Sequence, residues 1–331
     1  MSDTSEAYAP PRVGEPAPIT RLFGWGMLTI LVAFLVNNVL TVFLKWPGAS
    51  AAFGDGGGLA WAQLALYVLA ISAAAAITFG KPDVALRYDA KKISDFNAYL
   101  IRSCFWVVLF VGVVDTAIAF MRVENFLPIF FGEEWAKEFG RPRYVGPYVH
   151  VPLIILGFVV GVFTRTLGFT WLALLIVIAE LLIVISRFVF SYEQALMGDL
   201  VRYWYAALFL FASAYTLLED GHVRVDVFYA GMNPRKKGRV NALGAICLGM
   251  VTMWVIIFIG YNGATAVLNK PMLSFEISQT GATGMYTKYQ MAAFLGVFAI
   301  TMLIQFVSYL FEAVADMRDE PGKREIAPIS H

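Results

Sequence analysis

The sequence predicts an all-α integral membrane protein with about eight transmembrane helices and no soluble domain. Of its 331 residues, 59% are apolar and only 15% are charged, whereas a typical soluble domain has about 25% charged residues. The apolar residues form long blocks, and several blocks reach the roughly 20 residues that a helix needs to cross a bilayer. A single soluble core could not bury them all, because too little polar sequence remains to cover it.

Eight apolar blocks are candidate membrane spans. They are Leu22–Leu44, Leu59–Phe79, Tyr99–Phe120, Tyr148–Phe163, Phe169–Phe188, Leu200–Leu218, Val240–Tyr261 and Gln290–Phe311. The first block is longer than the apolar region of a cleavable signal, which has roughly 7–15 residues, so we expect it to be retained. The fourth block is short and contains Pro152, so it either crosses the membrane or re-enters it.

The distribution of Lys and Arg predicts the orientation, because these residues accumulate in cytoplasmic loops. If all eight blocks cross, sixteen of the 25 basic residues share the side of both termini. They are Arg12, Arg21, Lys81, Arg87, Lys91, Lys92, Arg102, Arg165, Arg224, Arg235, Lys236, Lys237, Arg239, Arg318, Lys323 and Arg324. This bias predicts a multi-pass membrane protein with both termini in the cytoplasm. It also favours a true crossing by the fourth block, because seven spans would move the basic loops of one half to the opposite side.

Composition divides the chain into four segments. Residues 1–21 are polar and rich in proline, and we expect a disordered cytoplasmic tail there. Residues 22–164 form an N-terminal transmembrane extension of about four helices, and residues 165–315 form a four-helix domain. Residues 316–331 form a second cytoplasmic tail.

Two loops on the predicted outer side stand out. In the first, Trp135 and Phe139 are four residues apart and would share one face of a short interfacial helix. The second, residues 262–288, is rich in Gly, Ser and Thr, so we expect a flexible contact surface there.

The composition argues against several chemical functions. The net charge is +1, which gives no indication of nucleic-acid binding. Cys104 and Cys247 lie far apart in apolar blocks, so we expect neither a disulfide nor a metal site. The sequence has only three histidines, contains no HExxH motif, and offers no plausible nucleophile with a base nearby. We therefore expect no enzyme, no metal and no cofactor.

Ionisable groups inside the predicted spans are few. Each costs free energy in the bilayer, so each is a candidate for a structural or functional role. Glu180 lies midway along the fifth block, and Asp115 lies in the last third of the third block. Each is expected to make an interhelical or subunit contact, with ion coupling as the alternative. Asn37 and Asn38 most simply form hydrogen bonds with a neighbouring helix. The pair of broken helices typical of many secondary transporters is missing from the sequence pattern.

The C-terminal half carries a series of short motifs in a fixed order. Arg187-Phe-Val-Phe190 ends the fifth block, and Gly198-Asp-Leu-Val-Arg-Tyr203 opens the sixth. Gly221-His-Val-Arg-Val-Asp226 and Asn233-Pro-Arg-Lys-Lys237 follow before the seventh block. Together they resemble the small membrane subunit of tripartite ATP-independent periplasmic (TRAP) transporters, the DctQ-like family. The chain departs from that family's pattern at Leu196, where tryptophan is usual, and at Gly198, where a first glutamate is usual.

The resemblance implies a function for residues 165–315 as a DctQ-like four-helix domain. It implies a non-catalytic subunit of the cell inner membrane that acts as a scaffold for sodium-driven uptake of an organic acid. The implied partners are a large DctM-like permease subunit, which carries the sodium and substrate sites, a periplasmic DctP-like solute-binding protein, and membrane lipids. The first four blocks are an addition to the family's usual four helices, so the resemblance does not cover their role.

The motif residues are candidates for structural or subunit contacts. Asp199 and Arg202 are three residues apart and can pair on one face of a helix. Arg187 can extend to the membrane interface from the preceding helix end. Neither position needs to touch a substrate.

The segment after the sixth block is a further structural candidate. Gly221 lets the chain turn out of the helix, and His222, Arg224 and Asp226 alternate with valines as in an extended or interfacial segment. We expect Arg224 to bind an internal carboxylate or a lipid headgroup and so fix the tilt of the flanking helices. The alternative is a plain solvated loop.

A second function class stays open at this point. The chain could be an autonomous eight-helix transporter or channel, with a pathway around Asp115 and Glu180. The presence of genes for a large permease and a secreted binding protein beside this one would favour the subunit hypothesis.

Overall fold

The computed structural model describes residues 9–165, 168–218, 227–278 and 280–323, and the regular structure in these ranges is helical apart from one isolated bridge. The α-helices are α1 (Pro18–Val42), α2 (Gly57–Gly80), α3 (Leu86–Val123), α4 (Leu127–Phe139), α5 (Pro142–Val145), α6 (Val151–Phe163), α7 (Phe169–Val189), α8 (Ala195–Leu218), α9 (Val227–Ala230), α10 (Pro234–Gly244), α11 (Val251–Gly260), α12 (Asn269–Ser274) and α13 (Lys288–Met317). Two π-helical turns, η2 (Gly146–His150) and η3 (Ala245–Met250), join α5 to α6 and α10 to α11. Two 3₁₀ turns, η1 (Ala49–Phe53) and η4 (Gly281–Thr283), complete the order. The predicted all-α class is confirmed.

Eight of the described helices are long and apolar enough to cross a membrane, one for each predicted block. They are Pro18–Val42, Gly57–Gly80, Leu86–Val123, Pro142–Phe163, Phe169–Val189, Ala195–Leu217, Pro234–Gly260 and Lys288–Met317. This agreement confirms the multi-pass membrane class. The largest difference is in α3, which begins at Leu86 rather than at Tyr99.

Helix α3 begins thirteen residues before the third predicted block, Tyr99–Phe120, so most of the sequence between the second and third blocks is helical. Arg87 and Lys91 lie on the first turns of the helix. Leu86, Ala90 and Ile93 recur at helical spacing and are all buried, so this polar stretch has an apolar face that packs. A search for continuous apolar blocks does not detect such an amphipathic helix start.

The fourth span is longer than its apolar block because a π turn extends it towards the N-terminus. The turn η2 lies between α5 and α6; Pro147 is its second residue, and Pro152 is the second residue of α6. Proline has no backbone N–H to donate, and a wider turn accommodates the interrupted hydrogen-bond ladder. The resulting 22-residue helix is long enough for a full crossing.

The chain folds into two compact units. Unit 1 comprises Met1–Asn97, Thr216–Gly263 and Met302–His331, and unit 2 comprises Ala98–Tyr215 and Ala264–Thr301. Each unit takes residues from both sides of the predicted boundary at residue 164, and α3, α8 and α13 contribute to both. The division into an extension and a four-helix domain therefore stays a prediction about the sequence, distinct from how the chain packs.

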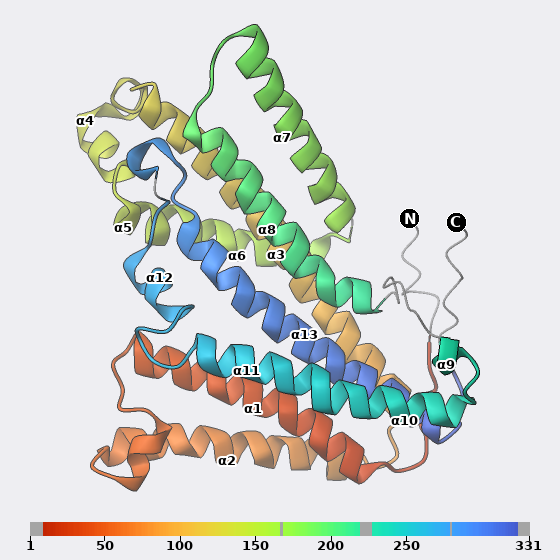
Figure 1. The fold of residues 1–331 in the computed structure, drawn as a ribbon. Helices are drawn as coiled ribbons and strands as arrows, with labels where there is room; N and C mark the ends of the chain where they lie inside the picture. Colours follow the sequence, from red (N-terminus) through yellow and green to blue (C-terminus); the bar gives the residue numbers. More distant parts are fainter. Residues whose placement is uncertain (1–8, 166–167, 219–226, 279, 324–331) are drawn as a thin grey trace. The chain divides into compact units, whose positions relative to one another are not determined.

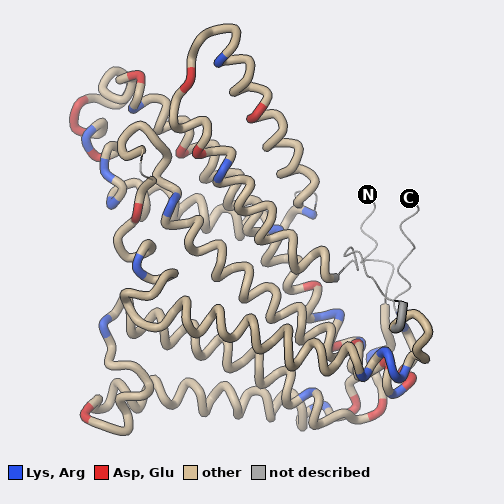
Figure 2. The backbone as a smooth tube through the Cα atoms, in the orientation of Figure 1, with Lys and Arg blue, Asp and Glu red and all other residues tan. Residues whose placement is uncertain are grey.

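In unit 1 the apolar helices α1, α2 and α11 run side by side (Figure 1). The Phe34 ring of α1 meets the Trp254 ring of α11 edge-on, with centroids 5.9 Å apart. Figure 2 shows that charged residues are missing from α2 and α11, as their sequences require. These helices have the composition of membrane spans and pack through apolar and aromatic surfaces.

The described part of the predicted N-terminal tail is ordered. The Gly14 N–H donates to the Asp83 carbonyl at 2.8 Å, and the Ala85 N–H donates to the Arg12 carbonyl at 3.1 Å. Helix α1 begins at Pro18, in the first-turn position that suits proline. The structure therefore orders the second half of the segment that we expected to be a disordered tail, while residues 1–8 lie outside the described residues.

In unit 2 close helix packing depends on two glycines of α6. A Cβ atom at Gly157 would lie 2.7 Å from the backbone nitrogen of Val107, and one at Gly161 would lie 2.2 Å from the Ser103 hydroxyl. The two glycines are four residues apart and so are their partners on α3. This is the small-residue spacing that lets two transmembrane helices approach each other closely.

Candidate functional site

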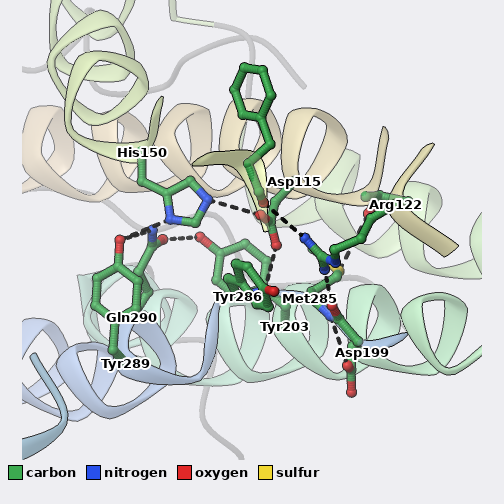
Figure 3. Close-up of polar contacts among 12 residues, drawn as sticks. Asp115, Arg122, His150, Asp199, Tyr203, Met285, Tyr286, Tyr289 and Gln290 are labelled. Atoms are coloured by element: carbon green, nitrogen blue, oxygen red, sulfur yellow. Dashed lines mark hydrogen bonds and ion pairs between the residues drawn. The ribbon is translucent and has the colours of Figure 1, made fainter. Parts of the chain in front are cut away.

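Polar side chains from four separate parts of unit 2 meet in its interior (Figure 3). They come from α3, from the π turn η2, from α8, and from the end of the loop before α13 together with the first turn of α13. We call this group the unit 2 polar cluster. Its members are Asp115, Arg122, His150, Asp199, Tyr203, Tyr286, Tyr289 and Gln290.

Asp115 is the most deeply placed carboxylate of the cluster, with a side chain that is 0% exposed. Its Oδ1 lies 3.1 Å from His150 Nε2, and its Oδ2 accepts the Tyr286 backbone N–H at 2.7 Å. Hydrogen bonds from such donors offset part of the cost of burying a carboxylate. The sequence identified Asp115 as a group that needs partners, and the structure supplies both from within the chain.

The hydrogen bonds that lead to Asp115 form a series in which each side chain can donate to the next. The Tyr203 hydroxyl donates to Gln290 Oε1, and Gln290 Nε2 donates to the Tyr289 hydroxyl at 3.1 Å. The Tyr289 hydroxyl lies 2.9 Å from His150 Nδ1. If His150 donates from Nε2–H to Asp115 and accepts at Nδ1 from the Tyr289 hydroxyl, each group in the series donates to the next one. Such aligned bonds polarise and strengthen one another.

Asp199, on α8, binds the loop between α12 and α13, to which Tyr286 also belongs. Its Oδ2 accepts the Met285 backbone N–H at 3.1 Å and the Ser278 and Thr280 hydroxyls at 3.2 Å. The predicted partner Arg202 is also present, with Nη1 3.6 Å from Asp199 Oδ1. The Arg202 side chain is 74% exposed, so this ion pair is the weaker part of the arrangement.

Arg122 binds backbone carbonyl groups of the loop between α12 and α13. The guanidinium donates to the carbonyls of Ala282 and Gly284, at 2.6 Å each, and lies 3.9 Å from the centre of the Tyr286 ring. The Tyr286 hydroxyl donates to the Gly140 carbonyl at 2.9 Å. Burial raises the pKa of this hydroxyl while Arg122 opposes the rise, so the phenol stays protonated and able to donate near neutral pH.

These contacts show that part of the segment expected to be a flexible contact surface, residues 262–288, binds buried groups of its own chain. Leu268, Met285 and Tyr286 are buried, and the consecutive amides of Met285 and Tyr286 bind two different carboxylates. The loop is polar because its backbone and hydroxyl groups bind the interior of unit 2. Several of its Ser, Thr and backbone groups therefore have partners within the chain.

Two cavities of unit 2 have linings that do not include the buried carboxylates. A cavity of about 430 Å³ lies among α3, α7 and α8, and its lining is apolar apart from groups such as Thr116. A second cavity of about 400 Å³, between α3 and the α4 region, is lined by apolar side chains. Neither lining includes Asp115 or Glu180. In the described ranges, moreover, no three His, Cys, Asp or Glu side chains gather as a metal site would require.

The remaining sequence-predicted residues do not join the cluster. Glu180 is exposed on α7, and the described residues give it no hydrogen bond or ion pair. Arg187 is exposed and lies 3.4 Å from Glu193. The other predicted contacts lie outside the described residues: Gly221, His222, Arg224 and Asp226.

Unit 1 contains a second set of buried polar contacts, built on arginines. Arg21 is 2% exposed and Asp89 is 6% exposed, and Arg21 Nε donates to Asp89 Oδ2 at 2.8 Å. The same guanidinium donates to the Thr78 and Lys81 carbonyls at the end of α2. Arg21 thus joins α1, α2 and α3 and satisfies carbonyls that the end of a helix leaves free.

Arg87 makes the corresponding connection between α3 and the end of α13. It forms ion pairs with Glu312 and with Asp316, the second at 2.7 Å, and it donates to the Glu320 carbonyl. Along the same two helices, the Ser94 and Ser308 hydroxyls lie 2.8 Å apart, and Asn97 donates to Gln305. Polar side chains therefore connect α3 to α13 in unit 1.

The predicted asparagine contact in the first span is confirmed for Asn37. Gln63 Nε2 donates to Asn37 Oδ1 at 2.9 Å and to the Thr41 hydroxyl. The Gln63 oxygen accepts the Gly48 backbone N–H at 2.8 Å. One glutamine therefore connects α2 to α1 and to the turn that follows α1.

Fold and site together define a class: a polytopic helical membrane protein whose buried polar groups bind one another. Residues 173–316 match the family model of tripartite ATP-independent periplasmic transporters, DctQ component. Several apolar helices precede the match, which covers rather less than half of the chain. The predicted resemblance is confirmed for residues 173–316, and the family that this region matches is one of transporter components. No curated protein and no solved structure matches the chain.

Proposed function

We propose that the chain is the scaffold subunit of a TRAP-type secondary transporter. In this role it anchors a large DctM-like permease subunit, which carries out sodium-driven uptake of an organic acid delivered by a periplasmic DctP-like binding protein. The family match supports the subunit role. Partners, substrate class and coupling ion follow from the family and not from contacts of this chain.

The observation that carries the scaffold role is the way in which the unit 2 polar cluster is satisfied. Asp115 and Asp199 take their donors from His150 and from backbone and hydroxyl groups of one loop. A coupling carboxylate has to exchange its partners for an ion or a proton during each transport cycle. Carboxylates that anchor a buried loop are better suited to holding the subunit rigid.

The linings of the cavities argue against the autonomous transporter. That alternative needs a polar pathway through Asp115 and Glu180, but neither residue lines a cavity of unit 2 given above. Eight spans and the basic residues on the side of both termini support a cytoplasmic location for both ends.

Reconstitution tests the proposal. Proteoliposomes that contain this chain alone should take up no organic acid under an inward sodium gradient. Vesicles that contain the chain with its large subunit, supplied with the binding protein, should show uptake, and omission of this chain should abolish it. Sodium-dependent uptake by the chain alone would refute the scaffold role.

A further inference from the structure

Helix α7 is the candidate span that its own chain covers least. Only 17% of its most apolar stretch is buried, the lowest value among the eight candidate spans, against 56% for α13. Val177, Leu181 and Val184 are all exposed along it. Most of the α7 surface is therefore available to lipid or to another protein.

Glu180 occupies the middle of this exposed helix. At 1.5 Å per residue it lies roughly 16 Å from the start of α7 and roughly 14 Å from its end. A bilayer core is about 30 Å thick, so a helix that crosses it places Glu180 near mid-depth. Acyl chains offer no donor to a carboxylate at that depth.

The chain itself gives Glu180 no partner in the residues that the structure describes. Its side chain is exposed and makes no hydrogen bond or ion pair there. The basic residue on the same side of α7, Arg187, lies two turns further on and pairs with Glu193 at 3.4 Å. The carboxylates of Asp115 and Asp199, by contrast, each have several donors.

We propose that the α7 face around Glu180 binds a transmembrane helix of the large membrane subunit and that a basic side chain of that helix pairs with Glu180. Charge complementarity selects this partner, because a mid-depth carboxylate needs a cation or a donor. Val177 and Val184 lie one turn on either side and supply the apolar part of the same face. The inference rests on the proposed function, which names the partner.

Co-purification of the full chain with the co-expressed large subunit tests the pairing. Glu180→Leu should lower the amount of large subunit recovered by about tenfold, and Glu180→Gln by less, because the amide keeps its hydrogen-bonding capacity. Glu134→Gln is the matched control: Glu134 is an exposed carboxylate on α4, outside the candidate spans, and its replacement should change nothing. The melting temperature of the isolated chain should be the same for all three variants.

Photo-crosslinking locates the surface independently. A photoreactive residue at Val184 should crosslink to a helix of the large subunit that has a Lys, Arg or His within one turn of the crosslinked position. The control position is Ile178, which is also exposed but belongs to the side of α7 that borders the cavity with α3 and α8. It should give little crosslinked large subunit.

The outcomes separate the two proposals. If the parent chain does not co-purify with the large subunit, the proposed function fails and this inference fails with it. If the parent co-purifies and Glu180→Leu does so equally well, only this inference is overturned. Crosslinks from Val184 to lipid alone, or to a second copy of the chain, would overturn it in the same way.

Discussion

Units 1 and 2 both bury carboxylates, but they satisfy them in different ways. In unit 1, Asp89 and Asp316 pair with the arginines Arg21 and Arg87. In unit 2, Asp115 accepts from a histidine ring and a backbone amide and has no ion pair with lysine or arginine among the described contacts. Buried arginines pair with the carboxylates of unit 1, whereas the carboxylates of unit 2 accept from consecutive backbone amides of one loop.

The difference has a structural consequence. The arginines of unit 1 join one helix to another near helix ends, where guanidinium groups also reach free carbonyls. The carboxylates of unit 2 join helices to a loop through that loop's own backbone. Unit 1 contacts therefore fix helix positions, whereas unit 2 contacts fix the path of the chain into α13. Substitutions should separate these two roles.

The largest effect is expected for Arg21→Ala in unit 1. Removal of the guanidinium leaves the buried Asp89 carboxylate without a cation and with only the Trp25 indole N–H at 3.0 Å, which should lower the free energy of unfolding in detergent by about 4 kcal/mol. Arg21→Lys keeps the charge but loses the planar fork, so it should recover only part of this loss. Arg202→Ala is the control, because that arginine is 74% exposed and should cost almost nothing. Equal losses from the two alanine variants would contradict the unit 1 account.

A slightly smaller loss is expected for Asp115→Ala in unit 2. It leaves His150 and the Tyr286 amide without their acceptor, at a cost of about 3 kcal/mol. Asp115→Asn should cost less, because its amide oxygen still accepts from Tyr286. Thermal unfolding of the purified chain measures both, with Glu180→Gln as the unpaired control. A stability like the parent's for Asp115→Ala would show that the unit 2 polar cluster does not hold the fold.

Helix packing in unit 2 provides the next test. Gly157→Ala places a Cβ atom 2.7 Å from the Val107 backbone nitrogen, which α3 can relieve only by moving. We expect a loss of about 2 kcal/mol from this overpacking. Gly198→Ala on α8 meets no atom within 4 Å and should be neutral or slightly stabilising. Equal stabilities of the two variants would contradict the close approach of α6 to α3.

The smallest effect is expected for Asp199→Ala. Ser278 and Thr280 can still bind each other, so the main loss is the acceptor for the Met285 amide, at a cost of about 1 kcal/mol. Hydrogen exchange at Met285 should become faster in this variant and stay unchanged in Arg202→Ala. Faster exchange in Arg202→Ala alone would mean that the ion pair, and not the amide contact, holds the loop.

The sequence predicted the fold class and all eight spans because bilayer thickness imposes long apolar blocks. It failed at the start of α3, where burial follows a helical face rather than a continuous block. It also extended the disordered tail too far, since nothing local shows that Arg21 would bind Asp89 on another helix. Helix ends were therefore harder to predict than helix existence.

The candidate site was predictable only in part. Asp115 was identified because a carboxylate inside a span is costly whatever surrounds it. Its partners His150 and Tyr286 lie 35 and 171 residues away, so only the folded chain reveals them. The sign that could have pointed to His150 was its position in an apolar block between two prolines, where a helix is expected to be irregular. For Tyr289 and Gln290 no local sign exists.

The central claim is that the buried carboxylates of unit 2 hold the subunit together and take no part in ion coupling. The most direct test is the sodium dependence of uptake by the reconstituted complex that contains Asp115→Asn. We predict less assembled complex but, per complex, the same sodium concentration at half-maximal rate and the same steepness as for the parent. Normal assembly with an altered sodium dependence would contradict the claim and place Asp115 in a transport pathway.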